Sequence, residues 1–432
     1  MQKNFVIRPE DIEYYKKQGV PLPTISPTER ERRRLAFRND PSLWYRKCDL
    51  SGEKILSQYP ADAKFPVYKV DYWWEKDYEI PCADYDFERS FFEQFFELKN
   101  KVPHMSLVVD YASVVNCDYC HQLGYSKNCY LISRAMRNES CFYSFYIDDS
   151  LMSFDCLVVR YCELCYECID CRNCYNLNFS QNCRNCHDSA FLFDCIGCSD
   201  CFCCVNLRRK KYCIFNKEYT KEEYKRELAR LWPKSHEDEE KLSKKLAEFR
   251  KKFPHQAVYG HQNENSVGNH LYNSKNAFYC FDAYELWDCA YCSMLHMAKD
   301  CYDVTIFGDN VELCLECVTA GTHSYNLKFC IDCHVDVSYF EYCDLCYSSK
   351  YLFGCIGLRN KSYCILNKQY SKEEYEDLVP RIKAHMRQTG EYGEFFPMKY
   401  SPFLYKQSTA NLFWPLSDSE IEKLGLTNTS HV

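Results

Sequence analysis

The most regular pattern of apolar and polar positions along the chain lies between Cys117 and Cys213. Taken in steps of three from Cys117, these positions include 17 of the 18 cysteines in the interval, and only Cys203 falls between them. The remaining positions hold Leu, Ile, Val, Ala and Ser, with Asn138 and Lys210 as the polar exceptions. Chance would place a third of the cysteines there, so the spacing indicates a structural repeat.

A period of three does not fit the ordinary elements. An α-helix repeats every 3.6 residues and a strand every two, so neither keeps such a stripe on one face. The residue before the stripe position is often Asn, Asp or Gly, which tolerate left-handed backbone and turns. We therefore predict a β-solenoid that bends at these corners and points small side chains inward as ladders. The corner residues are Asp170, Asn173, Asn176, Asn182, Asn185, Asp188, Asp194, Gly197, Asp200 and Asn206.

The solenoid pattern occurs twice. The sequence CIFNKEYTKEEY at residues 213–224 agrees with CILNKQYSKEEY at residues 364–375 at nine of twelve positions. In the second copy the cysteine phase shifts, which predicts interrupting loops. Cys280, Cys289, Cys292 and Cys301 share one frame, Cys314 and Cys317 a second, and Cys330 and Cys333 a third, and Cys343 to Cys364 return to the first. Each copy ends in a predicted capping box that starts a helix, Thr220 with Glu223 and Ser371 with Glu374.

The rest of the chain has mixed patterns. Helical spacing occurs at residues 8–19, 28–40 and 86–100, and the last places Phe91, Phe92, Phe95, Phe96 and Leu98 on one side, which is typical of a core face. Residues 67–80 are rich in aromatics and predict a strand or hairpin edge. The charged residues 225–255, broken at Pro233, predict solvated helices.

These patterns together predict a mainly β protein with helices. We expect two cysteine-lined β-solenoid lobes with capping helices and an N-terminal α+β domain. The expected domains are an N-terminal domain (1–103), a first solenoid lobe (104–219), a charged helical linker (220–256), a second lobe (257–370), and a C-terminal helix with an aromatic tail that packs across the lobes (371–432).

Composition narrows the class of protein. The 432 residues suffice for two or three domains, and 46% of them are hydrophobic, so the chain is globular. A net charge of -7 argues against nucleic acid as a partner. No signal peptide and no long apolar segment is found, so we expect a cytoplasmic protein without a membrane partner and with reduced cysteines.

Three chemistries remain open for the cysteines. Cysteine behaves as a small apolar residue, so the repeat fits a core ladder. Repeated Cys-x-x-Cys is also typical of structural zinc sites, although a ladder spaces sulfurs about 4.8 Å apart instead of gathering them around one ion. A thiol relay would require an exposed cysteine of low pKa. The candidate zinc ligands are Cys162, Cys165, Cys168, Cys171, Cys174, Cys183, Cys186, Cys195, Cys198 and Cys201.

Other functional signals are sparse. His121, His187 and His334 each follow a cysteine, but neighbouring side chains of an extended chain point to opposite faces, so we interpret them as surface residues. The sequence contains no phosphate-cradling glycine loop, no nucleophile elbow and no HExxH helix, and we predict no catalytic residues.

Several segments resemble a family of uncharacterised, cysteine-rich proteins that are abundant in candidate-phyla bacteria with reduced genomes. They are residues 5–59, VYKVDYWWEKDY at 67–78, ELCYECIDCRNCYN at 163–176, TGEYGEFFP at 389–397 and SPFLY at 401–405. The resemblance implies an N-terminal Cys-Pro-x-Cys-Arg zinc knuckle, but residues 26–30 read SPTER here, and of nearby cysteines only Cys48 remains. Some members carry a coenzyme A transferase label, which nothing in this chain supports.

The sequence therefore predicts a non-enzymatic repeat protein that acts as a scaffold for protein partners. A multi-site zinc protein for metal storage or sensing is the first alternative, and a thiol oxidoreductase is the second.

Overall fold

A computed structural model describes residues 5–40, 42–110, 112–293, 296–299, 315–318, 328–331 and 338–426. The fold is mixed α/β, with many strands in several parallel sheets. The chain forms two compact units, a central unit (Leu107–Gln256) and a composite unit (Met1–Ser106 with Ala257–Val432). Within the described ranges, none of the helices combines the length and apolar character needed to cross a lipid bilayer.

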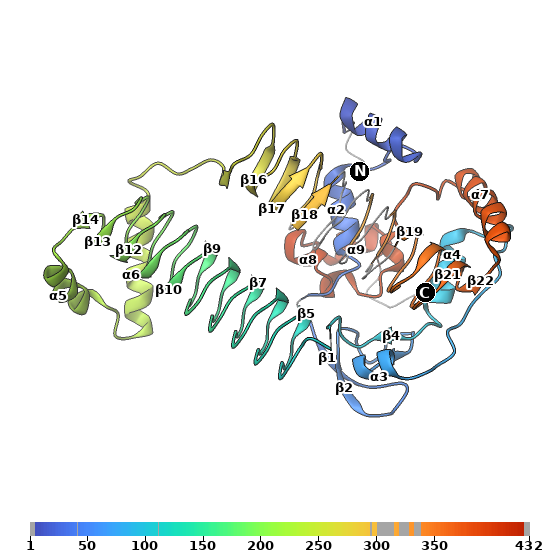
Figure 1. Cartoon of the computed structure of the whole chain (residues 1–432), viewed down its shortest axis with the longest axis horizontal. Helices are drawn as coiled ribbons and strands as arrows, with labels where there is room; N and C mark the ends of the chain where they lie inside the picture. Colours follow the sequence, from blue (N-terminus) through green and yellow to red (C-terminus); the bar gives the residue numbers. More distant parts are fainter. Residues whose placement is uncertain are drawn as a thin grey trace. The chain divides into compact units, whose positions relative to one another are not determined.

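The central unit is built from coils of twelve residues. Each strand pairs in parallel with the strand one coil later, as in His121 with Ser133 and Ser133 with Phe145. Figure 1 shows these strands as successive rungs, and we call residues 109–216 the first stack. Its strands are β5 (His121–Gly124), β6 (Ser133–Met136), β7 (Phe145–Asp148), β8 (Leu157–Arg160), β9 (Ile169–Arg172), β10 (Tyr175–Asn178), β11 (His187–Ala190), β12 (Ser199–Phe202) and β13 (Lys211–Ile214), and the antiparallel β14 (Lys217–Glu218) ends it.

Every coil contains four triplets of the same conformation. From Asn116 to Phe215 each third residue has a positive φ, including all ten predicted corner residues. The next residue points inward, and the one after it pairs with the coils on either side. The corners also include Tyr, Leu, Arg and even Val158, for which this backbone is unfavourable. Hydrogen bonds to both neighbouring coils hold these corners in place.

The stripe cysteines line the interior of the first stack, as the three-residue period predicts. They form one buried cluster with the Leu, Ile, Val and Ala residues that share the stripe. Cys203, the cysteine outside the period, is a corner residue and lies in a separate apolar cluster with Phe191 and Phe202. The period therefore separates inward from outward cysteines correctly.

Two helices cover the last coils of the central unit. α5 (Lys221–Leu231) and α6 (His236–Arg250) are separated around Pro233, as predicted. Thr220 and Glu223 form the expected capping box, in which each side chain accepts a backbone N–H. Leu246 of α6 is buried in the cluster that contains Phe202 and Ile214.

The composite unit contains the second stack, whose described residues are 260–293, 296–299, 328–331 and 338–369. Its strands are β15 (Gly260–His261), β16 (Val267–Tyr272), β17 (Phe278–Trp287), β18 (His296–Lys299), β19 (Ser338–Glu341), β20 (Lys350–Phe353), β21 (Ser362–Ile365) and β22 (Lys368–Gln369). Its first coil is one residue short. Gly260 pairs with Leu271, eleven residues later, whereas Gly268 pairs with Cys280, twelve residues later. Cys301, Cys314 and Cys333 lie outside the described residues, as does most of the predicted interruption.

Gly268 marks the register change in the short coil. A Cβ atom at this position would lie 1.8 Å from the carbonyl oxygen of Cys280 in the next coil. No other residue type fits there without separating the two coils. The glycine thus allows an eleven-residue coil to stack on a twelve-residue one.

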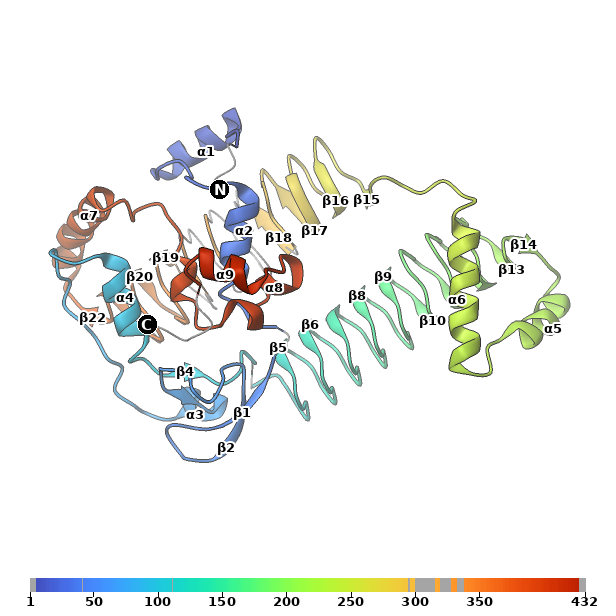
Figure 2. The ribbon, with the colours of Figure 1, turned by 180° about the vertical axis from the view of Figure 1, so that it is seen from behind.

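The termini of the chain pack in the composite unit, where Figure 2 shows α2 and α4 with the C-terminal helices. The elements are α1 (Pro9–Gln18), α2 (Pro27–Leu35), β1 (Trp44–Lys47), β2 (Lys54–Ser57), β3 (Val67–Tyr68), α3 (Val70–Glu75), α4 (Phe91–Lys99), β4 (His104–Met105), α7 (Lys372–Gln388), η1 (Met398–Tyr400), η2 (Tyr405–Gln407), α8 (Ala410–Phe413) and α9 (Asp418–Lys423). The predicted core face of α4 is buried, and Phe95 stacks on Phe396 of the tail at 4.8 Å.

One predicted element is wrong. Residues 67–80 form only a two-residue strand, and Val70–Glu75 is a helix, α3. Its Trp73 is fully buried, and the indole N–H donates to the carbonyl of Pro103 at 2.9 Å. The aromatic residues that suggested a strand are therefore held by tertiary packing in a helical turn. The capping box of Ser371 and Glu374 at the start of α7 is confirmed.

Candidate functional site

The inward side chains of the first stack form four columns, because residues twelve apart lie above one another. Each of the ten candidate cysteines lies in one of these columns and is buried. Cys162, Cys174, Cys186 and Cys198 form one unbroken column, and Cys171, Cys183 and Cys195 form a second; Cys165 and Cys201 share the third with Leu177 and Ser189, and Cys168 lies in the fourth.

The thiols are bonded to the backbone of the coils that surround them. Sγ of Cys162 donates to the carbonyl of Arg160 in its own coil at 3.4 Å and to that of Cys171 at 3.6 Å. Its sulfur also accepts the backbone N–H of Cys174, one coil later. Cys174 repeats the pattern with the carbonyls of Arg172 and Cys183. Such a thiol is protonated and donates a hydrogen bond, and its sulfur also accepts a hydrogen bond from an inward-pointing backbone N–H.

Serine side chains in the same columns make equivalent hydrogen bonds to the backbone. Ser150, directly before Cys162 in its column, donates to the carbonyl of Asp148 at 2.8 Å and accepts the N–H of Cys162 at 3.3 Å. Ser180 and Ser189 accept the N–H groups of Leu192 and Cys201. The stripe mixes cysteine with serine because both side chains are small and both satisfy an inward N–H.

Burial favours the neutral form of these thiols. It raises the pKa of Cys171 in the first stack and of Cys343 and Cys346 in the second. A buried thiolate would need a counter-charge or a metal ion, whereas a neutral thiol needs only the carbonyl acceptors that the coil supplies. The geometry and the protonation state therefore agree for these three thiols, whereas interactions with neighbouring thiols lower the pKa of Cys183 and of Cys198.

The sulfurs adjoin one another in pairs without converging. Cys183 lies beside the thiols of Cys171, Cys186 and Cys195, its neighbours along and between coils. In the part of the chain that the structure describes, no three cysteine sulfurs all lie within 4.8 Å of one another. A tetrahedral zinc ion holds its sulfurs about 3.8 Å apart. The columns as they stand do not form such a site.

Cys117 differs from the other cysteines of the first stack. It belongs to the first coil, and its side chain is partly exposed, whereas Cys120 and Cys129 are buried. The N–H of Cys129 donates to its sulfur at 3.4 Å, and the thiols of Cys120 and Cys129, which donate to the carbonyls of Asp118 and Lys127, lie beside it. These neighbours lower the pKa of Cys117. Cys117 is thus an accessible thiol with thiolate character at the end of the columns.

The histidines beside cysteines differ from one another. His187 is exposed, as predicted, and its Nδ1 lies 3.1 Å from Oδ2 of Asp188. The prediction for His121 is wrong, because this side chain is buried and its Nδ1 accepts the N–H of Val108 at 3.2 Å. Val108 lies before the first coil and covers it, which the local sequence does not reveal. His334 lies outside the described residues.

Residues 26–30, which read SPTER, form the start of a helix. Ser26 is the N-cap of α2 and accepts the N–H of Glu29 at 3.3 Å, and Pro27 is the first helical residue. Cys48 is buried in a separate cluster with Ile55 and accepts the N–H of Lys69 at 3.4 Å. Ser26 and Cys48 therefore both accept hydrogen bonds from backbone N–H groups of the fold.

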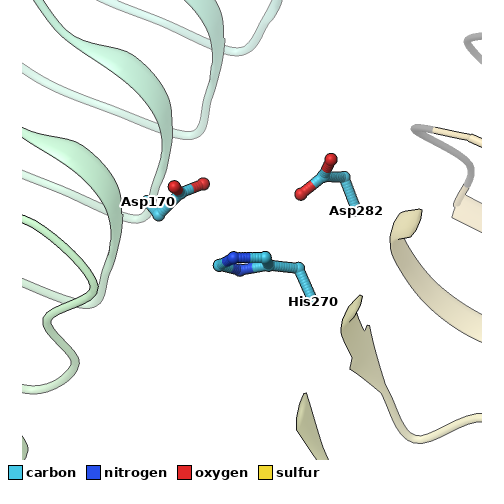
Figure 3. A group of neighbouring side chains, drawn as sticks. All are labelled: Asp170, His270 and Asp282. Atoms are coloured by element: carbon cyan, nitrogen blue, oxygen red, sulfur yellow. The ribbon is translucent and has the colours of Figure 1, made fainter. Parts of the chain in front are cut away.

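Polar side chains also mark the corners of the coils. Figure 3 labels Asp170, a corner of β9 in the central unit, and His270 and Asp282, corners of β16 and β17 in the composite unit. His270 and Asp282 are twelve residues apart on adjacent coils, with their ligand atoms within 4.8 Å of each other. Two such groups on one face form a polar pair and do not make a metal site by themselves.

Comparison with known proteins adds no relative. No model of a protein family matches the chain, and no curated protein is significantly similar to it. The functional interpretation therefore depends on the geometry of the two stacks.

Proposed function

We propose that the protein is a non-enzymatic scaffold built on two β-solenoids, each lined by cysteine and presenting its outer faces to protein partners. The twelve-residue register, the four repeated triplets and the parallel pairing of successive coils support the solenoid architecture. Stacked repeats give a long, regular outer surface, which is what repeat proteins use for binding.

The observation that carries this proposal is the bonding of the buried thiols. Each donates to a carbonyl two residues earlier, and most also donate to one nine residues later. A thiol used in this way is part of the backbone network and offers neither a nucleophile nor a free ligand. The cysteines then serve packing, which fits a reducing compartment such as the cytoplasm.

Zinc binding is the second candidate, favoured by the adjacent thiols around Cys183. Elemental analysis of the full chain, purified without chelator under reducing conditions, separates the two functions. The scaffold predicts less than about a tenth of a zinc ion per chain, whereas two or more tightly held ions would replace it with a metal protein.

The thiol oxidoreductase alternative is tested by alkylation of the folded protein at neutral pH. The scaffold predicts that the ten column cysteines, Cys162 to Cys201, react only after unfolding. Fast reaction of any of them in the folded state would contradict the structural role. Affinity capture from a native lysate should return the same protein partner in replicate experiments, and an empty capture would count against a scaffold.

A further inference from the structure

One edge of the first stack binds an amphipathic helix of the same chain. α6 places Leu246 and Phe249 against the last coils, where Phe249 meets the ring of Phe215 edge-on at 5.2 Å. Basic side chains of the helix lie over aromatic rings, with the Arg250 guanidinium 3.3 Å from the centre of Phe193 and Lys245 4.6 Å from that of Phe215. We call this surface of the last coils, which includes Phe193 and Phe215, the seat of α6. It binds apolar side chains together with positively charged ones.

The columns that form this seat continue into the earlier coils, where the side chains are more exposed, although Glu239 of α6 still lies close to Tyr166. Phe191, Phe193 and Phe202 beneath the helices are at most 4% exposed. In the same columns Tyr143 is 54%, Leu131 42% and Phe154 38% exposed. We call these uncovered residues the exposed strip: Leu131, Tyr143, Phe154, Leu157, Tyr166 and Ile169.

The strip and the seat form one continuous surface. Phe142 and Phe154 stack at 5.0 Å, Tyr166 meets Phe179 at 5.2 Å, and Phe179 stacks on Phe191 at 4.6 Å beside the covered coils. An apolar surface that a helix covers at one end and that stays uncovered over several coils at the other marks an interaction site.

The charge of the strip matches that of the helix already bound. Asp155 and Glu167 are the corner residues between Tyr143 and Phe179, and both lie close enough to Tyr166 to help raise its pKa, after burial as the main cause and together with Glu239 of α6. The part of α6 that meets the rings is basic, since residues 241–254 contain six Lys or Arg and one Glu. An acidic aromatic strip therefore complements a basic helix.

We propose that the exposed strip binds a basic amphipathic helix of a partner protein, with Leu or Phe anchors on the aromatic columns and Lys or Arg beside Asp155 and Glu167. This inference rests on the proposed scaffold function and names the partner class. Helix binding in an apolar groove is a common form of peptide recognition, and here the chain itself shows the required side chains.

A fluorescent peptide of residues 241–254 is the direct probe, because it contains the anchors that already fit these columns. Anisotropy with the full chain should show saturable binding that weakens as salt is raised from 50 to 500 mM. Absence of binding would overturn the proposal. The proposal would also be overturned if the peptide displaced the chain's own α6. Crosslinking would detect this displacement, because the peptide would then be joined to the coil that contains Phe202 and not to the exposed strip.

Matched variants locate the binding. Leu131→Asn with Tyr143→Asn removes two anchors at corner positions, where Asn tolerates the left-handed backbone. We expect peptide binding at least tenfold weaker. Tyr125→Asn with Tyr161→Asn removes equally exposed rings from another corner of the same stack, and we expect less than a twofold change. Equal effects of the two pairs would refute the assignment.

Two further results separate this inference from the proposed function. Asp155→Asn with Glu167→Gln should weaken binding about threefold and reduce its salt dependence; unchanged salt dependence would refute the charge argument. Sedimentation of the unliganded chain should show the same oligomeric state with and without Leu131→Asn and Tyr143→Asn. A dimer lost in the variant would show that a second copy occupies the strip, which overturns the inference, while the metal and alkylation results would still support a scaffold.

Discussion

Replacement of Cys162 by serine and by alanine tests the bonding of the columns. In the structure the sulfur of Cys162 accepts the N–H of Cys174 and donates to the carbonyls of Arg160 and Cys171. Ser150 makes the equivalent bonds one coil earlier, so Cys162→Ser extends an existing pattern. Alanine removes the acceptor and leaves the inward N–H of Cys174 without a partner.

The magnitudes follow from the groups involved. A buried donor left unsatisfied costs about 1–3 kcal/mol, and the small cavity left by the sulfur adds roughly 1 kcal/mol. Serine keeps the hydrogen bonds and loses only part of the apolar contact, about 1 kcal/mol. We therefore expect Cys162→Ser to be more stable than Cys162→Ala by about 1–3 kcal/mol.

Cys203 provides the matched control within the same stack. Its sulfur lies in an apolar cluster with Phe191 and Phe202, where a serine hydroxyl would be buried without the column's partners. The order should reverse there, with alanine more stable than serine by about 1 kcal/mol. Urea unfolding under reducing conditions, followed by far-UV circular dichroism, measures both pairs. The same order at both positions, or alanine favoured at Cys162, would refute the hydrogen-bonding role.

Three other features of the structure predict measurable effects. Gly268→Ala should destabilise the composite unit by more than about 2 kcal/mol in urea unfolding, because the added Cβ meets the carbonyl of Cys280. Cys117 should be the stack thiol that iodoacetamide modifies first, and its rate should fall less between pH 8 and pH 6 than that of a free thiol, because its pKa is lowered by the neighbouring thiols and by the N–H of Cys129, which donates to its sulfur. Burial, together with the nearby Lys99, lowers the pKa of His104 from 6.5 to about 4. The unfolded chain therefore binds this proton at a higher pH than the folded protein does. The free energy of unfolding should fall as the pH drops from 6.5 toward 4, by roughly 2 kcal/mol at pH 5.

Each of these effects has a control. Gly124→Ala should change stability by less than about 1 kcal/mol, because the nearest atom to its Cβ would be a Met136 side-chain carbon at 3.6 Å. Mass spectrometry of the first modified peptide checks Cys117, and an equally fast Cys117→Ser variant would contradict that assignment. His104→Gln should remove most of the stability loss between pH 7 and pH 5, and an unchanged pH profile would show that other groups cause it.

The three-residue period predicted which positions between Cys117 and Cys213 are buried and which have left-handed backbone. Inward positions, corner positions and the separate orientation of Cys203 all follow from the three-residue spacing. The capping boxes at Thr220 and Ser371 are local signals and are also confirmed. Corners such as Val158 were beyond prediction, because their left-handed backbone is held by hydrogen bonds from adjacent coils and runs against their own preference.

Features that depend on contacts between distant segments were not predictable. α3 is helical because Trp73 is buried against Pro103 and its neighbours, although its local sequence favours a strand. His121 is buried by the segment around Val108. The bonds from most thiols to the carbonyl nine residues later depend on how coils stack, which spacing alone leaves open. The exposed strip could have been found by reading the chain at an interval of twelve, which groups Leu131 with Tyr143.

The twelve-residue coil also determines how the first stack responds to force. The backbone hydrogen bonds that join one coil to the next lie along the axis of the stack. A pull on one end loads the bonds of the last coil before those of any other, so coils should peel away singly. Each released coil frees twelve residues, which extend to about 40 Å. The stack would therefore lengthen in equal steps, and its core thiols would reach solvent one coil at a time, in the order in which the coils are peeled away.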